Sequence, residues 1–347
     1  MSVPANPAAA AVPATMRAAV LRGPGEVVVE EVDVPAPGPG EALVRLRACG
    51  ICGSDLMDWY VATKAPGVFG HEPSGEVVAV GPGVDWLRPG ERVFVHHHAP
   101  CMECEVCRRG DHVHCPTWKP NVLKPGGMAE YAVVGAQSVR HDTLPLPPHV
   151  SFAAGTLVEP AACVVKALRR ARFAPGMRVG IIGLGFIGQM FGFLARAGGA
   201  GFIAGSDVLE SRRALAAEHW ADEVWDARLA GPAASFDLVV VTPASPAAMR
   251  AGVGLVRNGG TLLLFAPTPP GQDVGMPVFE LFFREITVVT SYSAGPSDTR
   301  AALAHVAAGH LPEHVLISHR FPLAEAAEAY RAAGRTGEVL KVIVTMD

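Results

Sequence analysis

The sequence predicts an α/β protein of two domains, a β-rich domain followed by a domain with a doubly wound parallel sheet. Its 347 residues exceed the size at which a single hydrophobic core usually stops growing. From Met16 to about Arg140, short apolar stretches alternate with Gly/Pro turns, which is typical of β structure. After His149, apolar strand candidates alternate with helical stretches, which predicts parallel strands with helices on both faces.

The β-rich domain is predicted to cover residues 16–150. Strand candidates such as Leu43–Leu46 and Glu76–Val80 are bounded by turns such as Gly81–Gly83, and this spacing favours an irregular, barrel-like arrangement. Residues 1–15 are almost all Ala, Pro and Val and show no periodicity, so we expect a disordered arm there.

The second domain is predicted to cover residues 151–292. A Gly/Pro stop follows it, and we expect a helix at Asp298–Ala308 and a last strand at Glu338–Val344. Residues 293–347 are expected to return to the first domain, which makes that domain discontinuous in sequence. The strand candidates of the second domain are Met177–Ile182, Gly201–Ser206, Asp237–Thr242 and Thr261–Phe265.

Composition and charge exclude several classes of protein. Half of the residues are hydrophobic and 18% are charged, which argues against disorder. The apolar runs are shorter than the ~20 residues that a membrane-spanning helix needs. A net charge of −4, from 29 basic and 33 acidic residues, offers no basic surface for a polyanion. We therefore expect a soluble protein without a nucleic acid or membrane partner.

Four cysteines spaced C-x2-C-x2-C-x7-C indicate a structural zinc site. Two-residue gaps let thiolates converge on one tetrahedral ion, about 2.3 Å from each sulfur, and four thiolates leave no position open for chemistry. Disulfides are the alternative, but they need an oxidising compartment, and the N-terminus lacks the pattern of a secretory signal. We therefore expect a cytoplasmic protein. The four residues are Cys101, Cys104, Cys107 and Cys115.

The segment Gly183-Leu184-Gly185-Phe186-Ile187-Gly188 indicates a dinucleotide site. It directly follows a strand candidate and opens a helix candidate, which is the context that this motif requires. The first glycine permits the tight turn, the second lets backbone N–H groups approach the pyrophosphate, and the third allows close packing of helix on strand. Phe186 and Ile187 lie between the last two glycines of the motif, and the helix candidate runs through Gln189 to Ala197, with its N-terminus favouring the phosphates. The sequence therefore predicts a Rossmann domain.

Asp207 favours NAD over NADP. It lies at the end of the next strand candidate after Gly188, where a carboxylate accepts hydrogen bonds from ribose hydroxyls and repels a 2′-phosphate. Arg212 and Arg213 count against this preference because an arginine at this corner can bind a 2′-phosphate. With Asp207 present, the interpretation of both as exposed helix residues is favoured.

A second metal site is suggested by Cys52, His71 and Glu159. Cys52 lies in a turn of small residues, and His71 is followed by Glu72. One thiolate, one imidazole and one carboxylate leave zinc a fourth position for water or substrate, as a catalytic site requires. Each residue alone has a plainer interpretation, because a single Cys or His in an apolar chain is more often a packed core residue.

Taken together, these motifs resemble the zinc-dependent medium-chain dehydrogenases, in order and over about residues 16–347. The resemblance is closest to the branch that contains the sorbitol (polyol) and threonine dehydrogenases. It is carried by the turn around Cys52, the Gly70-His71-Glu72 segment, the four-cysteine lobe, residues 126–131, Glu159-Pro160 and the glycine motif.

This resemblance implies a GroES-like catalytic domain, a Rossmann coenzyme domain and an active site in the cleft between them. It also implies that Cys52 and His71 bind a catalytic zinc, with Glu72 or Glu159 as the carboxylate ligand, so that each chain holds two zinc ions. The Ser54 hydroxyl matches the group that hydrogen-bonds the substrate oxygen. Relatives form homodimers or homotetramers, usually through coenzyme-domain strands such as 287–292.

The chemistry of zinc then suggests the reaction. Zinc makes a bound hydroxyl more acidic, as it lowers the pKa of water from about 15.7 to about 7, and it holds the oxygen while the carbinol carbon gives a hydride to nicotinamide. We therefore expect an NAD-dependent zinc alcohol dehydrogenase that acts on the CH–OH group of a secondary alcohol such as a polyol, sugar or cyclitol.

Two alternatives remain open. A threonine-type amino-alcohol dehydrogenase is the alternative among enzymes, and Glu159 counts mildly against it because those relatives tend to carry Asp before the proline. A catalytically silent NAD-binding zinc protein is the alternative from another class. That alternative predicts the loss of Cys52 or His71, and both are present.

Two features depart from the family pattern, and one further motif could suggest a third metal site. Met57 stands where many relatives carry the histidine that ends a proton relay, so the proton must pass from Ser54 through the coenzyme ribose, water or another residue. Trp220 replaces a usual glycine and is interpreted as filling a surface pocket. Residues 96–98 are three consecutive histidines, which strand geometry points to opposite faces, so a contact with the substrate is favoured over a shared ion.

Overall fold

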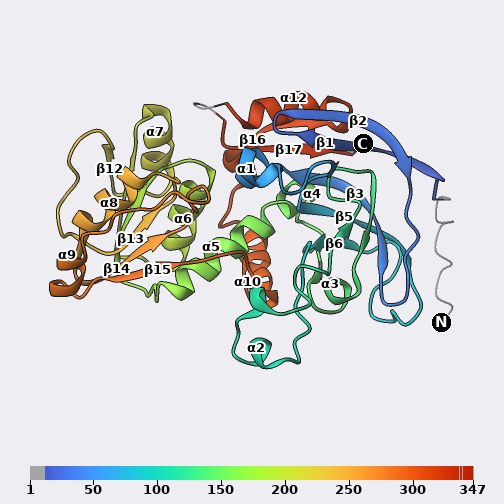
Figure 1. Cartoon of the computed structure of the whole chain (residues 1–347), viewed down its shortest axis with the longest axis horizontal. Coiled ribbons are helices and arrows are strands. Elements are labelled where there is room, and N and C mark those ends of the chain that lie inside the picture. Colours follow the sequence, from blue (N-terminus) through green and yellow to red (C-terminus); the bar gives the residue numbers. More distant parts are fainter. Residues whose placement is uncertain (1–11, 336, 338, 347) are drawn as a thin grey trace. The chain divides into compact units, whose positions relative to one another are not determined.

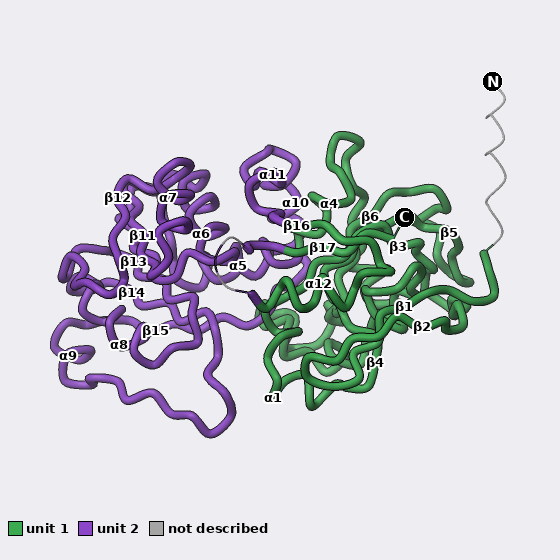
Figure 2. The backbone as a smooth tube through the Cα atoms, turned by 90° about the horizontal axis from the view of Figure 1, so that it is seen from above, with its two compact units in different colours: residues 1–158, 319–334, 342–347 green, residues 159–318, 335–341 purple. Residues whose placement is uncertain are grey.

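The computed structural model of the protein describes residues 12–335, 337 and 339–346. The chain divides into two compact units: unit 1 comprises Met1–Val158, His319–Gly334 and Val342–Asp347, and unit 2 comprises Glu159–Ser318 and Arg335–Lys341 (Figure 2). Residues 1–11 of the predicted arm lie outside the described residues, and the first strand begins at Thr15. The predicted domain boundaries at 150/151 and 292/293 remain predictions, and the compact units divide at other residues.

Unit 1 is built on an eight-stranded sheet and a smaller three-stranded sheet (Figure 1). The path of the larger sheet is β16-β17-β3-β5-β6-β9, and β8 joins it by pairing with β3 and β7. The smaller sheet has the order β2-β1-β4. Its strands are β1 Thr15–Gly23, β2 Glu26–Asp33 and β4 Gly67–Val68; those of the larger sheet are β3 Ala42–Gly50, β5 Glu72–Val80, β6 Arg92–Val95, β7 Leu123–Lys124, β8 Tyr131–Val134, β9 Thr143–Pro145, β16 Ile317–Pro322 and β17 Lys341–Thr345.

Strand β3 lies at the centre of unit 1. It pairs with β5, β8 and β17, all antiparallel, and most of its residues are buried. Such a run of buried residues marks a strand that is covered on both faces. The short helices of this unit are η1 Gly53–Leu56, α1 Asp58–Val61, α2 Glu105–Arg108, η2 His112–His114, α3 Ala136–His141, α4 Phe152–Gly155, η3 Leu323–Glu325 and α12 Ala326–Ala333.

Unit 2 contains a six-stranded parallel sheet with the order β12-β11-β10-β13-β14-β15. Counted from its own first strand this is the order 3-2-1-4-5-6, so the predicted doubly wound Rossmann sheet is confirmed. The strands are β10 Arg178–Ile182, β11 Phe202–Asp207, β12 Glu223–Asp226, β13 Phe236–Val241, β14 Val256–Leu264 and β15 Thr287–Thr290.

Strands of unit 2 are connected by the helices α6 Phe186–Ala197, α7 Glu210–His219, α8 Pro246–Leu255 and α9 Val278–Phe283 (Figure 1). Helix α5 Val158–Arg170 precedes the first strand of the sheet, and α10 Pro296–Ala307 and α11 Glu313–Leu316 follow its last strand. Among the described residues, no helix combines the length and the apolar character that a membrane span needs.

Glycine is required where α6 begins. Gly183 has φ +86°, which L side chains rarely adopt. A Cβ at Gly188 would lie 1.9 Å from the carbonyl oxygen of Gly183, so only glycine lets α6 start this close to the end of β10. The glycine motif thus shapes the backbone at the carboxyl end of the first parallel strand, where ligands bind in sheets of this type.

Replacing Gly188 by Ala is therefore expected to destabilise the protein by about 3 kcal/mol, because the new methyl group overlaps backbone and not a movable side chain. Urea unfolding followed by circular dichroism measures this. Gly254→Ala is the matched control: Gly254 lies in α8 with nothing within 4 Å of a built Cβ, so the exchange should stabilise by about 0.5–1 kcal/mol. Equal effects of the two variants would contradict this account.

Candidate functional site

The four cysteines of the predicted structural site lie together in unit 1. Their sulfur atoms all lie within 4.8 Å of one another, with neighbouring pairs 3.5–3.9 Å apart. Four sulfurs placed tetrahedrally around zinc at about 2.3 Å would be about 3.8 Å apart, whereas a disulfide needs an S–S bond of about 2.05 Å. All four are free cysteines. The donor set therefore fits a zinc ion and not a pair of disulfides.

The lobe that carries these cysteines has a very small core. Only Cys107, Val113, Cys115 and Trp118 form its buried cluster, with Cys101 and Cys104 packed against it. Backbone N–H groups of Cys101 and Cys104 point at the sulfurs of Cys115 and Cys101, at 3.3 and 3.4 Å. Such donors favour thiolates, because they stabilise negative charge on sulfur.

Cys52, His71 and Glu72 form a second group in unit 1. Each offers one ligand atom, and these atoms lie within 4.8 Å of one another. Cys52 precedes η1, and His71 directly precedes β5, whose first residue is Glu72. Glu72 is fully buried. A thiolate, an imidazole and a carboxylate at this spacing fit a zinc ion with an open position.

Close backbone packing fixes the segment before His71. Gly70 has φ +88°, and a Cβ there would lie 2.8 Å from Cγ of Met128 and 3.0 Å from Sγ of Cys49. Burial raises the pKa of the Cys49 thiol beyond its ordinary range, with the Glu72 carboxylate as the next cause. Cys49 therefore stays a neutral packing residue.

Asp55 supports this group and was not identified as a site residue from the sequence. Its carboxylate accepts a hydrogen bond from the Cys52 backbone N–H at 3.1 Å and lies 3.5 Å from Nδ1 of His71. Burial favours neutral forms of both side chains, but their mutual attraction outweighs it and lowers the pKa of Asp55 and raises that of His71. Tyr330 donates to the carbonyl oxygen of Asp55 at 2.6 Å. In the sequence, the Cys-Gly-Ser-Asp turn that contains Cys52 is the pattern that could have identified Asp55 as a site residue.

The other predicted residues occupy neighbouring positions. Ser54 is the second residue of η1, and Met57 lies between η1 and α1. Glu159, the second residue of α5, is 5% exposed, and its Oε1 lies 3.5 Å from the sulfur of Cys163. Glu159 belongs to unit 2, so the described geometry of the second metal group covers Cys52, His71 and Glu72.

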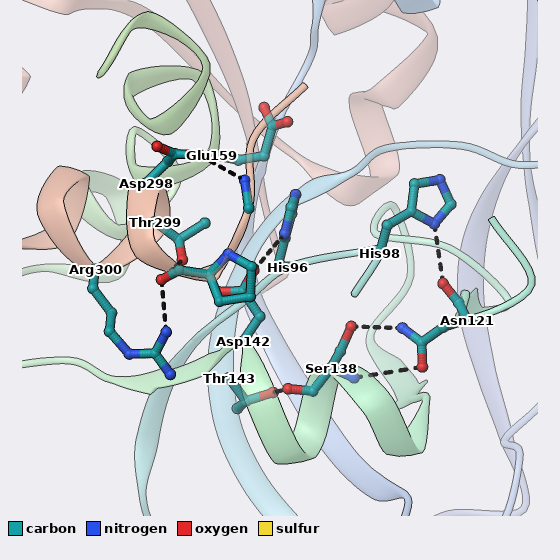
Figure 3. A network of polar contacts seen from close by, with 12 residues as sticks. His96, His98, Asn121, Ser138, Asp142, Thr143, Glu159, Asp298, Thr299 and Arg300 are labelled. Atoms are coloured by element: carbon teal, nitrogen blue, oxygen red, sulfur yellow. Dashed lines mark hydrogen bonds and ion pairs between the residues drawn. The ribbon is translucent and has the colours of Figure 1, made fainter. Parts of the chain in front are cut away.

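The three consecutive histidines make different contacts, and Figure 3 shows those of His96 and His98. His96 is fully buried, and its Nδ1 lies 2.7 Å from the Asp142 carboxylate. The His97 ring lies 4.9 Å from the ring of His71, centre to centre. The Nδ1–H of His98 donates to the Asn121 carbonyl at 3.0 Å. Burial lowers the pKa of His98 to about 4 and that of His97 well below its usual value, so both rings are neutral at pH 7.

The glycine motif in unit 2 forms a loop that is open on one side. Gly185 caps α6, and a Cβ there would meet only the Arg212 guanidinium, at 3.7 Å. Phe186, Ile187 and Gly188 form the first turn of α6. The N-terminus of this 12-residue helix suits a pyrophosphate, because its first N–H groups carry partial positive charge.

Asp207 ends β11 beside this loop. Its Oδ2 accepts from the backbone N–H of Leu184 at 2.8 Å, and its Oδ1 accepts from that of Leu209 at 2.9 Å. Arg212 lies 3.6 Å from the same carboxylate. Among the described residues, Nε of Arg212 is a buried nitrogen without a hydrogen-bond partner. Arg213 donates to the Asp207 carbonyl at 2.8 Å. The corner thus fits a polar ligand group.

The interpretation of Trp220 as a residue in a surface pocket was wrong. Its side chain is buried, with 3% exposed, and a Cβ at Gly192 would lie 2.2 Å from its ring. Its indole N–H donates to the amide oxygen of Gln189 at 2.8 Å. No pattern in the sequence indicates this contact, because the glycine that makes room for the ring lies in an earlier helix, α6.

Two family models match this chain. Residues 38–148 match the model of the alcohol dehydrogenase GroES-like domain. Residues 187–308 match the model of zinc-binding dehydrogenases. These two segments contain the cysteine lobe, the group around Cys52 and the corner at Asp207.

Individual relatives are similar over almost their entire length. The sorbitol dehydrogenase of Bombyx mori is 31% identical, over 94% of this chain and 97% of the relative. The L-galactonate-5-dehydrogenase of Escherichia coli K12 is 30% identical, over 95% of this chain and 99% of the relative. Among solved structures, a zinc-binding dehydrogenase from Sinorhizobium meliloti 1021 bound to NADP has a TM-score of 0.86 at 29% identity, over 96% of this chain and 99% of the other.

The contact between Asp55 and His71 leads to a prediction about metal retention. Asp55→Asn keeps the size of the side chain but removes the charge beside His71, so we expect metal affinity at the Cys52 group to fall by roughly 10- to 100-fold. Zinc retained after dialysis against a graded series of chelator concentrations measures this. Asp58→Asn, at the exposed start of α1, is the control and should retain zinc like the wild type. Equal retention in both variants would remove Asp55 from the site.

Proposed function

The chain belongs to the zinc-binding alcohol dehydrogenase family, and on this premise we propose that it oxidises a secondary alcohol of a polyol, sugar or cyclitol with NAD as the hydride acceptor. The observation that carries the proposal is the group of Cys52, His71 and Glu72, with ligand atoms within 4.8 Å, in a chain that also has a Rossmann glycine loop. A metal-binding donor set and a dinucleotide loop are the two parts that such a reaction requires.

Cys52, His71 and a carboxylate from Glu72 or Glu159 would hold the catalytic zinc. The described geometry favours Glu72, because its ligand atom lies with those of Cys52 and His71. When bound, zinc would lower the pKa of a substrate hydroxyl and polarise the product carbonyl. Asp55 holds Nδ1 of His71 and leaves Nε2 as the ring nitrogen that can face a metal.

The protein residues around this group orient the substrate and move its proton. Ser54, half-buried on η1 two positions after Cys52, supplies the hydroxyl that accepts the substrate proton while it releases its own hydrogen to the coenzyme ribose, to water or to another residue. Met57 cannot pass that proton on, because a thioether is only a weak acceptor. His97, next to His71 and neutral, offers a hydrogen bond to a further hydroxyl of a polyol.

Asp207 is the reason for preferring NAD. Its carboxylate stands at the end of β11 and would repel a 2′-phosphate, while its oxygens can also accept from ribose hydroxyls. Arg212 is held beside that carboxylate at 3.6 Å, which offsets its attraction for a phosphate.

A polyol, sugar or related substrate is favoured because relatives are named for sorbitol and L-galactonate. The free thiols of the chain support a reducing compartment such as the cytoplasm.

Zinc analysis and a substrate panel test the proposal together. The wild type is expected to contain two zinc ions per chain and to form NADH with a polyol, sugar or cyclitol. Cys52→Ser should keep one ion and lose activity by at least about 1000-fold, because the group that activates the hydroxyl is lost. Cys104→Ser should lose the other ion and mainly lower stability. The panel includes amino alcohols and simple alcohols.

The outcomes separate the alternatives. A single zinc ion in the wild type would contradict the catalytic site. Faster turnover of amino alcohols would favour a threonine-type enzyme. Two zinc ions and NADH binding without turnover of any panel member would favour a catalytically silent protein.

We also propose that the chain forms a homodimer or homotetramer through unit 2. Strand β15 is the edge of the parallel sheet, and helix α9 precedes it in the chain (Figure 1). This helix exposes Phe279, Phe282 and Phe283, each at least 68% accessible. An open strand edge and exposed aromatic side chains are both costly in water. A second copy of the same surface would cover both, as in an isologous dimer.

Phe282→Asp combined with Phe283→Asp is expected to shift the protein to the monomer, because the charges oppose burial of α9. Light scattering after size exclusion measures the mass. Val28→Asp, an exposed valine on β2 in unit 1 (42% accessible), is the control and should leave the oligomer intact. A wild type that is already monomeric would refute the proposed assembly.

A further inference from the structure

Gln189 is a fully buried amide whose hydrogen-bonding groups are paired on both sides. Its Nε2 donates to the carbonyl oxygens of Leu184 and Arg212, both at 3.0 Å, and its Oε1 accepts from the indole N–H of Trp220 at 2.8 Å. An indole N–H can only donate and a carbonyl oxygen can only accept, so this amide has one allowed orientation. Gln189 is thus locked by its three partners.

These partners come from the parts of the chain that surround the coenzyme corner. Leu184 lies in the glycine loop, Arg212 lies in the first turn of α7, and Trp220 follows the last residue of α7. The backbone N–H of Leu184 donates to the Asp207 carboxylate at 2.8 Å. Gln189 therefore holds the carbonyl of Leu184, and Asp207 holds the N–H of the same residue.

Trp220 is held as tightly as Gln189. Its ring fits over two glycines: a Cβ at Gly192 of α6 would lie 2.2 Å from the ring, and a Cβ at Gly205 of β11 would lie 3.2 Å from it. The Arg196 guanidinium donates to the Trp220 carbonyl at 2.7 Å and to the Asp222 carboxylate at 2.8 Å. The indole is thus wedged between α6 and β11 with its N–H directed at Gln189.

We propose that Trp220 is a positioning residue for coenzyme binding, which acts through Gln189 to hold the glycine loop against the corner formed by Asp207 and Arg212. The inference rests on the proposed function in one respect, that a nicotinamide dinucleotide binds this loop. Backbone N–H groups bind a pyrophosphate well only if the loop is already in place, since ordering it on binding costs affinity.

The physical reason is the cost of an unpaired buried acceptor. Without the indole N–H, the Oε1 of Gln189 has lost its donor in a site closed to water. Rotation of the amide then relieves Oε1 only by breaking a bond to Leu184 or Arg212. The Leu184 carbonyl is then no longer tied to α7 through Gln189, and only the bond from the Leu184 N–H to Asp207 still holds this loop residue.

A double-mutant cycle on coenzyme binding tests this. NADH fluorescence titrations give Kd for the wild type, Trp220→Phe, Gln189→Met and the double variant. Phe removes the donor together with part of the ring volume, and the volume effect is controlled by the Trp225→Phe exchange described below. Each single variant should raise Kd by roughly tenfold, and the double variant should be no weaker than Gln189→Met, because both changes remove one shared contact.

A matched exchange separates positioning from general packing. Trp225→Phe makes the same substitution in unit 2, where Trp225 packs against Phe236 with ring centres 6.3 Å apart, and it should leave the Kd for NADH unchanged. The Kd of Asp207→Ala for NADH shows how much affinity is lost when the ribose contact itself is removed. Trp220→Phe should also bring the Kd values for NADH and NADPH closer together. If Trp220 had only a structural role, the exchange would lower the melting temperature and leave the ratio of these two Kd values unchanged.

The possible results each decide the matter. A wild-type Kd in Trp220→Phe, an equal loss in Trp225→Phe, or additive effects in the double variant would overturn the positioning role. If Trp220→Phe does not fold, Gln189→Met alone decides by the same Kd and selectivity criteria. A wild type that binds NADPH and not NADH contradicts the proposed coenzyme, and the same cycle is then measured with NADPH. A wild type that binds neither overturns both.

Discussion

The antiparallel register of β3 and β5 is the constraint on which the metal group depends. Gly50, the last residue of β3, pairs with Glu72, the first residue of β5, so the chain leaving one strand lies beside the chain entering the other. This brings Cys52 next to His71 although a helical turn, α1 and β4 separate them in the sequence. A shift of one residue would turn Glu72 to the other face of the sheet, and the three ligand types would no longer meet.

Unit 2 applies a different constraint to the coenzyme. There the parallel strands end at one edge, and the glycine loop and Asp207 lie at the ends of neighbouring strands β10 and β11. Main-chain N–H groups supply the binding surface, so the specificity of the corner depends on backbone position. Side chains buried behind that surface, such as Gln189, therefore contribute to affinity by holding the backbone in place.

Features whose partners lie close along the chain were predictable from the sequence. The cysteine lobe and the glycine loop are each complete within one short segment, and their spacing carries their geometry. The parallel sheet followed from the alternation of strands and helices. By contrast, the ligand role of Cys52 and His71 needed a family resemblance, because no local spacing links them. Asp55 and Gln189 were missed, since a carboxylate or an amide acquires its role from partners that only the folded chain supplies.

Trp118 connects the cysteine lobe to the row of histidines. Its indole is fully buried in the small cluster of the lobe, and the rings of His96 and His98 pack on it at 5.4 and 5.8 Å. An ion bound by the cysteines would draw the residues of this small cluster together around the indole. A metal that performs no chemistry would thus set how rigid the imidazoles next to the reactive group can be, and demetallation of the lobe would act on catalysis at a distance.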